Sequence, residues 1–344
     1  MRELISSMLS ILMMPLATLS GIMCLAIGLS AAPVEEQTDQ RTKLDQSSFE
    51  SESPQKWFPS RFGENDTLGA INLLSPEKVL EAVRLVTSGK TYALGIPTGP
   101  NTPAYPGRSY RIITMASGNG SGEHWGTNQM SGMDDAIFSH MGIGSQLDGL
   151  GHVGIAAKYY NGTEAREFFG PAGIKKFSTH EIPPIVSRGV LLDLTTLTKE
   201  AFLDAGTQIG PAEIQLALRK QNLEIKKGDV VLLHTGWSSI AENEPERFMK
   251  GEPGLTVAGA KYLASKNVVA VGADTWGVEV IPFENPDRIF EVHQTLLAKN
   301  GIYILENMHT ADLARDQVSE FLFVLGQPRF VGTVQVVINP VAIR

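Results

Sequence analysis

The sequence contains a single cysteine, Cys24, which lies in the apolar segment at the start of the chain. A folded domain that excludes this segment contains no thiol, which excludes disulfides, thiolate metal sites and a cysteine nucleophile. The chain also has no block of basic residues, and its formal net charge is −8. Nucleic acid and anionic membrane surfaces are therefore not expected as partners.

Two further absences narrow the possible functions. The glycine spacings match neither a dinucleotide fingerprint nor a P-loop, which argues against these two kinds of nucleotide site. After the first segment the sequence contains no transmembrane candidate and no internal repeat. What remains is an ordinary composition, 42% hydrophobic and 19% charged, which is typical of a globular protein with a substantial core.

The first 32 residues differ from all that follows. No charged residue occurs between Glu3 and Glu35, and the segment Leu4–Ala32 is rich in Leu, Ile, Met, Ala and Ser. Residues 1–32 end in small residues, which is typical of a secretory signal peptide and predicts a secreted or periplasmic protein. The apolar run is also long enough to be an uncleaved N-terminal membrane anchor.

The rest of the chain divides into a linker and one domain. Residues 33–56 are polar and almost free of large apolar groups, which predicts a disordered linker. Residues 57–344 alternate short β-branched runs with helical patterns, which predicts an α/β domain around a largely buried sheet. Strands are predicted at 91–96, 110–115, 190–194, 230–234, 268–272, 302–305 and 330–338, and helices at 76–88, 211–221, 257–266 and 290–299. Residues 116–152 predict a long functional loop.

The first of these helices has a clear beginning and an apolar stripe. Ser75 is a good N-cap and Pro76 suits the first helical position. Apolar residues then recur at helical spacing, which predicts a face turned towards the core. This predicted face consists of Val79, Leu80, Val83 and Val86.

The stretch GSQLDGLGHVG, residues 144–154, places an amide, a carboxylate and an imidazole close together at Gln146, Asp148 and His152. In an extended segment alternate side chains share one face, so Gln146 and Asp148 would point together. The glycines that follow permit a tight return of the backbone to His152. The pattern is that of part of a metal or acid/base site, although a hydrogen-bonded polar turn explains it equally well.

A second pair of candidate ligands occurs near the end of the chain. His293 lies on or beside the apolar face of the helix predicted at 290–299, and Glu306 follows the next strand. A helix descending about 10 Å and a strand returning about 13 Å would bring the two side chains to the same level. A carboxylate that ends a buried strand needs a partner. The pair is therefore a candidate for metal binding, with a structural core histidine as the alternative for His293.

Other polar and aromatic residues are weaker candidates. Asp274 ends a predicted strand, where a carboxylate serves a functional site or caps the next turn. His140 lies just before the 144–154 stretch and is a possible additional ligand. His124, Trp125 and Trp276 are candidate walls of a substrate pocket. A further histidine, His234, lies within a predicted strand and is expected to be a satisfied core residue.

These residues together resemble the cyclase-like metal-dependent hydrolases, a family that includes kynurenine formamidases and isatin hydrolases. The family signature reads His-x-Gly-Thr-His-x-Asp-x-x-x-His, and the corresponding residues here run from Gly142 to His152. The resemblance covers nearly all of residues 60–340. Its other similar stretches are 61–77, 228–237, 271–280 and 293–307.

The resemblance implies a compact single domain with a central barrel-like mixed β-sheet flanked by helices, of the swivelling β/β/α type. It implies a homo-oligomer that acts on a small-molecule substrate. It also implies that a divalent metal, Zn²⁺ or Mn²⁺, is held by Gln146, Asp148, His293 and Glu306, with His152 as the general acid/base. His140 and Asp274 would be additional ligands or would support the ligands.

The chain departs from the signature at two positions, where the family's first two histidines fall on Gly142 and Gln146. A glutamine oxygen is a neutral donor that suits a harder ion such as manganese better than zinc. With Gln146 the chain resembles the branch that includes a zinc-dependent dienelactone hydrolase, which implies the opening of a small lactone or ester. An aryl formamide or a cyclic amide is the alternative substrate. A second alternative is a binding protein whose catalytic site has lapsed.

Overall fold

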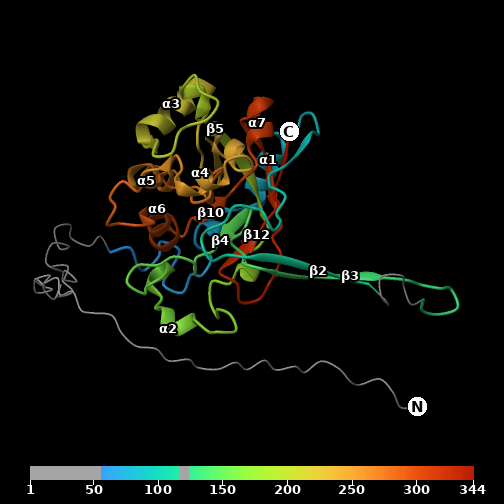
Figure 1. Ribbon diagram of the computed structural model, residues 1–344. Helices are drawn as coiled ribbons and strands as arrows, with labels where there is room; N and C mark the ends of the chain where they lie inside the picture. Colours follow the sequence, from blue (N-terminus) through green and yellow to red (C-terminus); the bar gives the residue numbers. More distant parts are fainter. Residues whose placement is uncertain (1–55, 117–123) are drawn as a thin grey trace, which may run out of the picture. The chain divides into compact units, whose positions relative to one another are not determined.

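The computed structural model describes residues 56–116 and 124–344, in which nine strands form one mixed sheet (Figure 1). Five strands at one side of it are β1 (Thr91–Ala93), β13 (Val341–Ile343), β11 (Glu320–Leu325), β5 (Ile185–Asp193) and β7 (Val230–His234). The order continues with β9 (Ala270–Ala273), β10 (Tyr303–Glu306), β4 (Gln146–Asp148) and β12 (Gln335–Val337). The sheet curls into a half-barrel flanked by helices, which confirms the predicted α/β class.

The segment predicted as a signal peptide, residues 1–32, lies outside the described residues. The same holds for the predicted linker, residues 33–56, except for its last residue. None of the helices in the described part of the chain has the length and hydropathy needed to cross a bilayer.

The middle of the sheet is parallel and largely buried. Strands β5, β7, β9 and β10 run parallel to one another in that order. Their residues are mostly Val, Ile, Leu and Ala, and Val230 to Leu233 have no exposed surface, as expected for strands covered on both faces. Because parallel strands end at the same edge, the residues that follow β7, β9 and β10 meet there.

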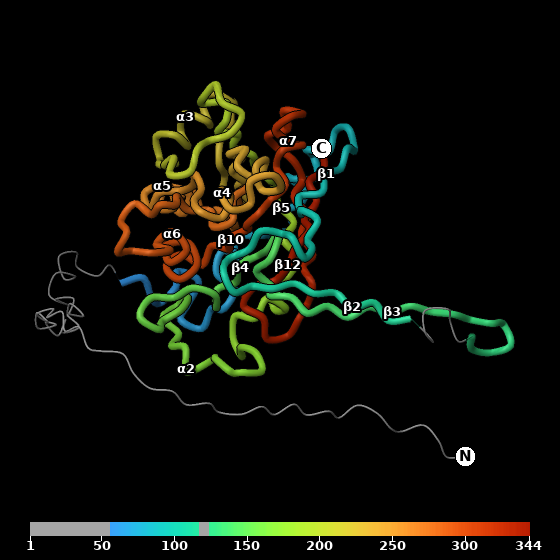
Figure 2. Tube along the Cα trace, in the orientation of Figure 1, coloured from blue at the N-terminus to red at the C-terminus, as the bar shows by residue number. Residues whose placement is uncertain are grey.

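Helices flank this parallel part. In both views, α3 (Pro211–Gln221), α5 (Val257–Ser265) and α6 (Glu291–His293) lie in a row beside the sheet (Figures 1 and 2). Successive helices in this row pack against each other. The helix predicted at 211–221 and the strand predicted at 230–234 are confirmed to the residue. Helix α6 continues as a π-helix over Gln294–Lys299, a wider turn that is often found at functional sites.

The first helix, α1 (Pro76–Val83), begins as predicted, because the Ser75 side chain accepts a hydrogen bond from the Lys78 amide. The predicted apolar face is wrong. Leu80 is 60% exposed and Val83 46% exposed, whereas Lys78 and Ala82 are buried. The Lys78 ammonium lies 2.8 Å from the buried carboxylate of Asp229, and this ion pair turns the opposite side of the helix towards the sheet.

The long loop predicted over residues 116–152 is also partly wrong. Residues Met133–Ser139 form β3, which pairs antiparallel with β2 (Tyr110–Ala116) in a hairpin that extends away from the rest of the domain (Figure 1). Ile112, Ile137 and Phe138 on this hairpin are more than half exposed. The strand predicted at 110–115 corresponds to β2. Since neither face of the hairpin is buried, the sequence of β3 lacks the alternation of polar and apolar residues that reveals a strand. Strands β11 and β13 were not predicted either.

Candidate metal centre

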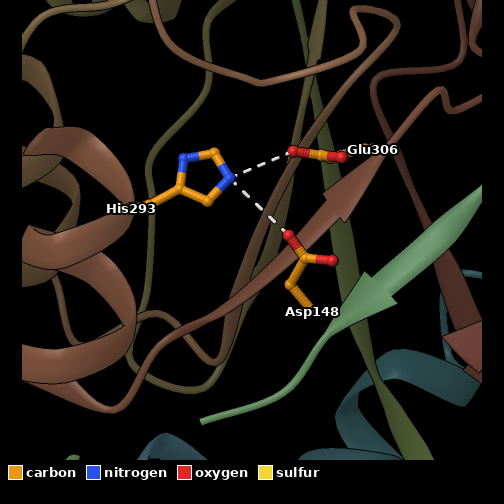
Figure 3. Close-up of side chains that lie close together, drawn as sticks. All are labelled: Asp148, His293 and Glu306. Atoms are coloured by element: carbon orange, nitrogen blue, oxygen red, sulfur yellow. Dashed lines mark hydrogen bonds and ion pairs between the residues drawn. The ribbon is translucent and has the colours of Figure 1, made fainter. Parts of the chain in front are cut away.

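Three side chains of ligand type meet where β4 lies beside β10 (Figure 3). They are Asp148 from β4, Glu306 from β10 and His293 from α6, and one ligand atom of each lies within 4.8 Å of the others. The Nε2 atom of His293 lies 3.1 Å from Glu306 Oε1 and 3.6 Å from Asp148 Oδ2. All three residues are buried. The predicted convergence of His293 and Glu306 is therefore confirmed.

The register between the strands explains this arrangement. Gln146 lies opposite Glu306, and Asp148 lies opposite Ile304 in the antiparallel β4–β10 pair. Paired residues share one face, as do alternate residues of one strand. Gln146, Asp148 and Glu306 therefore point to the same side, while Leu147 turns into the core with no exposed surface. The shared face predicted for Gln146 and Asp148 is confirmed.

The cluster contains buried oxygen atoms without hydrogen-bond donors. The Gln146 amide nitrogen donates to Glu306 Oε2 at 2.5 Å and to Asp148 Oδ1 at 3.3 Å. Gln335 also donates to Asp148 Oδ1, at 2.7 Å. Among the described residues, Gln146 Oε1 and Asp148 Oδ2 have no hydrogen-bond partner. Buried acceptors in native proteins are normally satisfied, and a bound divalent cation would satisfy these. The residues present therefore fit such an ion.

The electrostatics of the cluster also favour a cation. Burial raises the pKa of Glu306 to about 7, the charge of Asp148 adds to this rise, and His293 opposes it. Burial by itself would lower the pKa of His293, but Asp148, Glu279 and Glu306 around the ring raise it well above its ordinary value. Protons are therefore held among these groups, and a cation that binds there must replace them.

His152 lies beside the cluster on its more accessible side. Its Nε2 atom is 3.8 Å from Asp148 Oδ2, and its ring centre is 6.4 Å from that of His293. The side chain is 22% exposed, whereas that of Asp148 has no exposed surface. Burial lowers the pKa of His152, Asp148 opposes the shift, and the positive charges of His293 and Arg108 add to it. A neutral imidazole at this position can accept a proton from a reacting molecule.

Glu279, which was not predicted from the sequence, holds His293 in place. Its Oε1 atom lies 2.6 Å from His293 Nδ1 and accepts a hydrogen bond from the His293 backbone amide at 3.2 Å. A carboxylate on Nδ1 directs Nε2 towards the cluster and makes it a better ligand. The available signal in the sequence was a glutamate placed between two valines, Val278 and Val280, which are both buried.

We expect the Glu279→Gln variant to bind metal about 10- to 100-fold more weakly than the wild type. The amide keeps the shape of the side chain but removes the charge that increases the basicity of His293. Competition with a coloured chelator measures the affinity. Glu284→Gln, which neutralises an exposed glutamate on the same segment, is the matched control and should leave affinity unchanged. Equal affinities for the Glu279 variant and the wild type would contradict this role.

The sequence left two roles open for Asp274, a functional carboxylate or a cap of the next turn, and the structure shows the cap. Its carboxylate accepts hydrogen bonds from the amides of Thr235 and Gly236, at 2.9 and 2.8 Å, and from the Thr235 hydroxyl at 2.6 Å. It therefore caps the turn that follows β7. His234 lies 3.2 Å from the same carboxylate and 2.7 Å from the Thr310 hydroxyl, as expected for a satisfied core histidine.

The remaining candidates lie in two places. His140 is exposed at the base of the hairpin, where its Nδ1 atom accepts a hydrogen bond from the Ser109 amide at 2.9 Å. His124 and Trp125 are exposed on the part of the hairpin beyond β2 and β3. Neither group of residues contacts Asp148, His293 or Glu306 in the described structure.

Trp276, in contrast, belongs to an aromatic wall that reaches the cluster. Its ring centre lies 6.1 Å from that of Tyr105, which lies 6.4 Å from that of Phe290. The Phe290 ring centre is 5.2 Å from that of His293. The indole nitrogen of Trp276 donates to the carbonyl of Phe248 at 3.0 Å, which fixes the ring. The wall is suited to contact a flat ligand next to the cluster.

Comparison with known proteins agrees with this architecture. Residues 92–280 match a family model described as "Putative cyclase". A protein whose crystal structure is described as that of a novel cyclase shares 27% sequence identity with this chain, with a TM-score of 0.75. The match covers 82% of this chain and 96% of that one. A comparison with curated proteins finds no match.

Two isatin hydrolases share the fold at lower identity. Isatin hydrolase A from Ralstonia solanacearum is 16% identical, with a TM-score of 0.56, and the match covers 74% of this chain and 92% of that one. An isatin hydrolase bound to the product analogue thioisatinate is 15% identical, with a TM-score of 0.55, covering 78% and 98% of the two chains. At these identities the likeness concerns the fold alone.

Proposed function

The chain belongs to the cyclase family, and from the geometry of its buried cluster we propose that it is a metal-dependent hydrolase. The observation that carries the proposal is the convergence of Asp148, His293 and Glu306, with ligand atoms within 4.8 Å of one another. We assign the fourth ligand to Gln146, whose unpaired Oε1 atom is buried in the same place. Two carboxylates, an imidazole and an amide oxygen suit Zn²⁺ or Mn²⁺.

The chemistry divides between the ion and the protein. A divalent cation, when bound, polarises a carbonyl group and lowers the pKa of a water molecule towards neutrality. His152 would accept a proton from the attacking water and return it to the leaving group. Glu279 would hold His293 in the required orientation, and Gln335 would hold Asp148 through its 2.7 Å hydrogen bond.

We propose a small lactone or ester as the substrate. The support is Gln146 together with the Asp-Gly-Leu that follows it, a pattern that resembles the dienelactone-hydrolase branch. The aromatic wall of Tyr105, Trp276 and Phe290 would contact a ring-shaped molecule. An aryl formamide or a cyclic amide would need the same cluster and is the alternative to be tested against it.

We expect the purified protein to contain about one zinc or manganese ion per chain and to hydrolyse lactones or esters. A chelator should abolish the activity, and the added metal should restore it. A panel of lactones, aryl esters, aryl formamides and cyclic amides identifies the bond that is cleaved. Activity only on formamides or cyclic amides would favour the alternative substrates. A metal-loaded protein that cleaves none of them would point to a binding protein, and a protein that takes up no metal would contradict the proposal.

A further inference from the structure

Arg108 supplies a positive charge beside the cluster, in the segment just before β2. Its guanidinium donates to the backbone carbonyl of Gly142 and lies 5.8 Å from the ring centre of Tyr105. Over residues 56–116 and 124–344, no carboxylate lies within ion-pair distance of it. A guanidinium that loses hydration on burial needs acceptors or an acid to compensate its charge. Arg108 therefore has donors available for an anion.

The backbone segment that holds the guanidinium is bound to the end of β10. The side-chain amide of Asn307 donates to the Gly144 carbonyl at 3.1 Å, and the Ser145 hydroxyl donates to the Asn307 carbonyl at 2.6 Å. Asn307 directly follows Glu306, one of the proposed metal ligands. The guanidinium on Gly142 therefore lies in the segment that leads into the cluster.

Gly142 is required for this position of the guanidinium. A Cβ atom built on Gly142 would lie 2.4 Å from Nη1, 2.5 Å from Cζ and 2.8 Å from Nη2 of Arg108. The guanidinium thus lies against the glycine backbone, in space that any other side chain would occupy. Where the family signature has a histidine, this chain has a glycine covered by a cation. A guanidinium therefore lies where the resemblance would place an imidazole.

The side chains next to Arg108 define the rest of the ligand. Tyr105 is 46% exposed, and it connects the guanidinium to the rings of Trp276 and Phe290. Within the described residues only Nη1 of Arg108 has a hydrogen-bond partner, so Nε and Nη2 remain available. An arginine fork of this kind matches the two oxygens of a carboxylate. A flat molecule with a carboxylate group would satisfy both the wall and the charge.

We propose that Arg108 binds a carboxylate group of the substrate, so that the enzyme acts on small cyclic or aryl esters that carry a negative charge. This inference rests on the proposed hydrolase function and adds the class of substrate to it. Arg108 is a specificity-determining residue in this proposal. Proton transfer remains with His152.

Two aryl acetates of nearly the same shape, one charged and one neutral, test the inference. They are 4-carboxyphenyl acetate and 4-carbamoylphenyl acetate, and kcat and KM are measured for each with the metal-loaded full chain. We expect the wild type to favour the carboxylate, and Arg108→Gln to lower kcat/KM for it by about 10- to 100-fold, mainly through KM. Well above pH 6.5, where His152 is neutral with or without the charge of Arg108, hydrolysis of the neutral acetate should be unchanged, which also shows that the variant is folded. Arg111→Gln, which removes an exposed arginine three residues along, should change neither.

Each other outcome overturns the inference or separates it from the proposed function. Equal loss on both acetates would show that Arg108 supports the cluster instead of binding substrate. A wild type without preference for the charged acetate would also overturn it. If the wild type hydrolyses neither acetate, nor any member of the substrate panel, the hydrolase proposal fails. In that case the binding of benzoate and of benzamide, monitored by tryptophan fluorescence, decides whether Arg108 binds a carboxylate. Tighter binding of benzoate that Arg108→Gln removes would support its role, and equal binding would overturn it.

Discussion

The Asp148→Ala variant is expected to purify without metal and without hydrolase activity. Asp148 is fully buried, and its Oδ2 atom lies 3.6 Å from His293 Nε2. This oxygen accepts no hydrogen bond within the described residues. Loss of a residue that supports a ligand lowers metal affinity by about 10- to 100-fold. Loss of a ligand itself should lower the affinity further. Elemental analysis of the variant and hydrolysis of the preferred substrate measure both losses.

A second buried carboxylate provides the control for Asp148. Asp274 is also fully buried at the end of a strand, but its hydrogen bonds go to Thr235 and Gly236. Asp274→Asn should lower the thermal stability while the metal content per folded chain stays at the wild-type value. Asp148→Asn removes the charge but keeps the shape of the side chain, because its amide oxygen can still accept the hydrogen bond from Gln335. Full metal occupancy in Asp148→Ala would remove Asp148 from the ligand set.

The His152→Ala variant is expected to keep its metal and to lose about 10²- to 10⁴-fold in kcat. His152 lies 3.8 Å from Asp148 and is 22% exposed, so it is placed to exchange protons with a substrate. His140→Ala is the matched control, because His140 is exposed and bonded to Ser109. Loss of metal in His152→Ala would reassign His152 as a ligand.

The pH dependence provides a second test of His152. Burial lowers its pKa from the ordinary value of 6.5, and His293 and Arg108 add to the effect. The imidazole is therefore neutral above pH 6.5, and activity should fall only as the pH drops below that value and the base becomes protonated. The fall in kcat/KM on the acid side, after correction for metal loss, should be absent from the residual activity of His152→Ala. An unchanged profile in the variant would assign the titration to another group.

Much of the candidate site could be predicted from the sequence, because its signals are local. Alternation along an extended segment placed Gln146 and Asp148 on one face, and β4 has this arrangement. The lengths of one helix and one strand brought His293 and Glu306 together, and the structure places them 3.1 Å apart. In both cases the residues are near neighbours along the chain, so backbone geometry alone fixes their relation.

Contacts between distant segments account for what could not be predicted. The orientation of α1 depends on the ion pair between Lys78 and Asp229, and no property of the helix itself indicates that partner. Glu279 is recognised as the partner of His293 only once the two side chains are seen 2.6 Å apart.

The sequence by itself determined the α/β class and the positions of the central strands, and its family resemblance indicated the four residues that we propose as metal ligands. Only the tertiary structure decided how the site is supported and charged. Arg108 and Gly142 are 34 residues apart, and the exposed strand β3 between them carries no periodic signal. The physical reason is that hydrophobic periodicity records burial along one element, whereas a buried charge depends on partners that distant strands bring together.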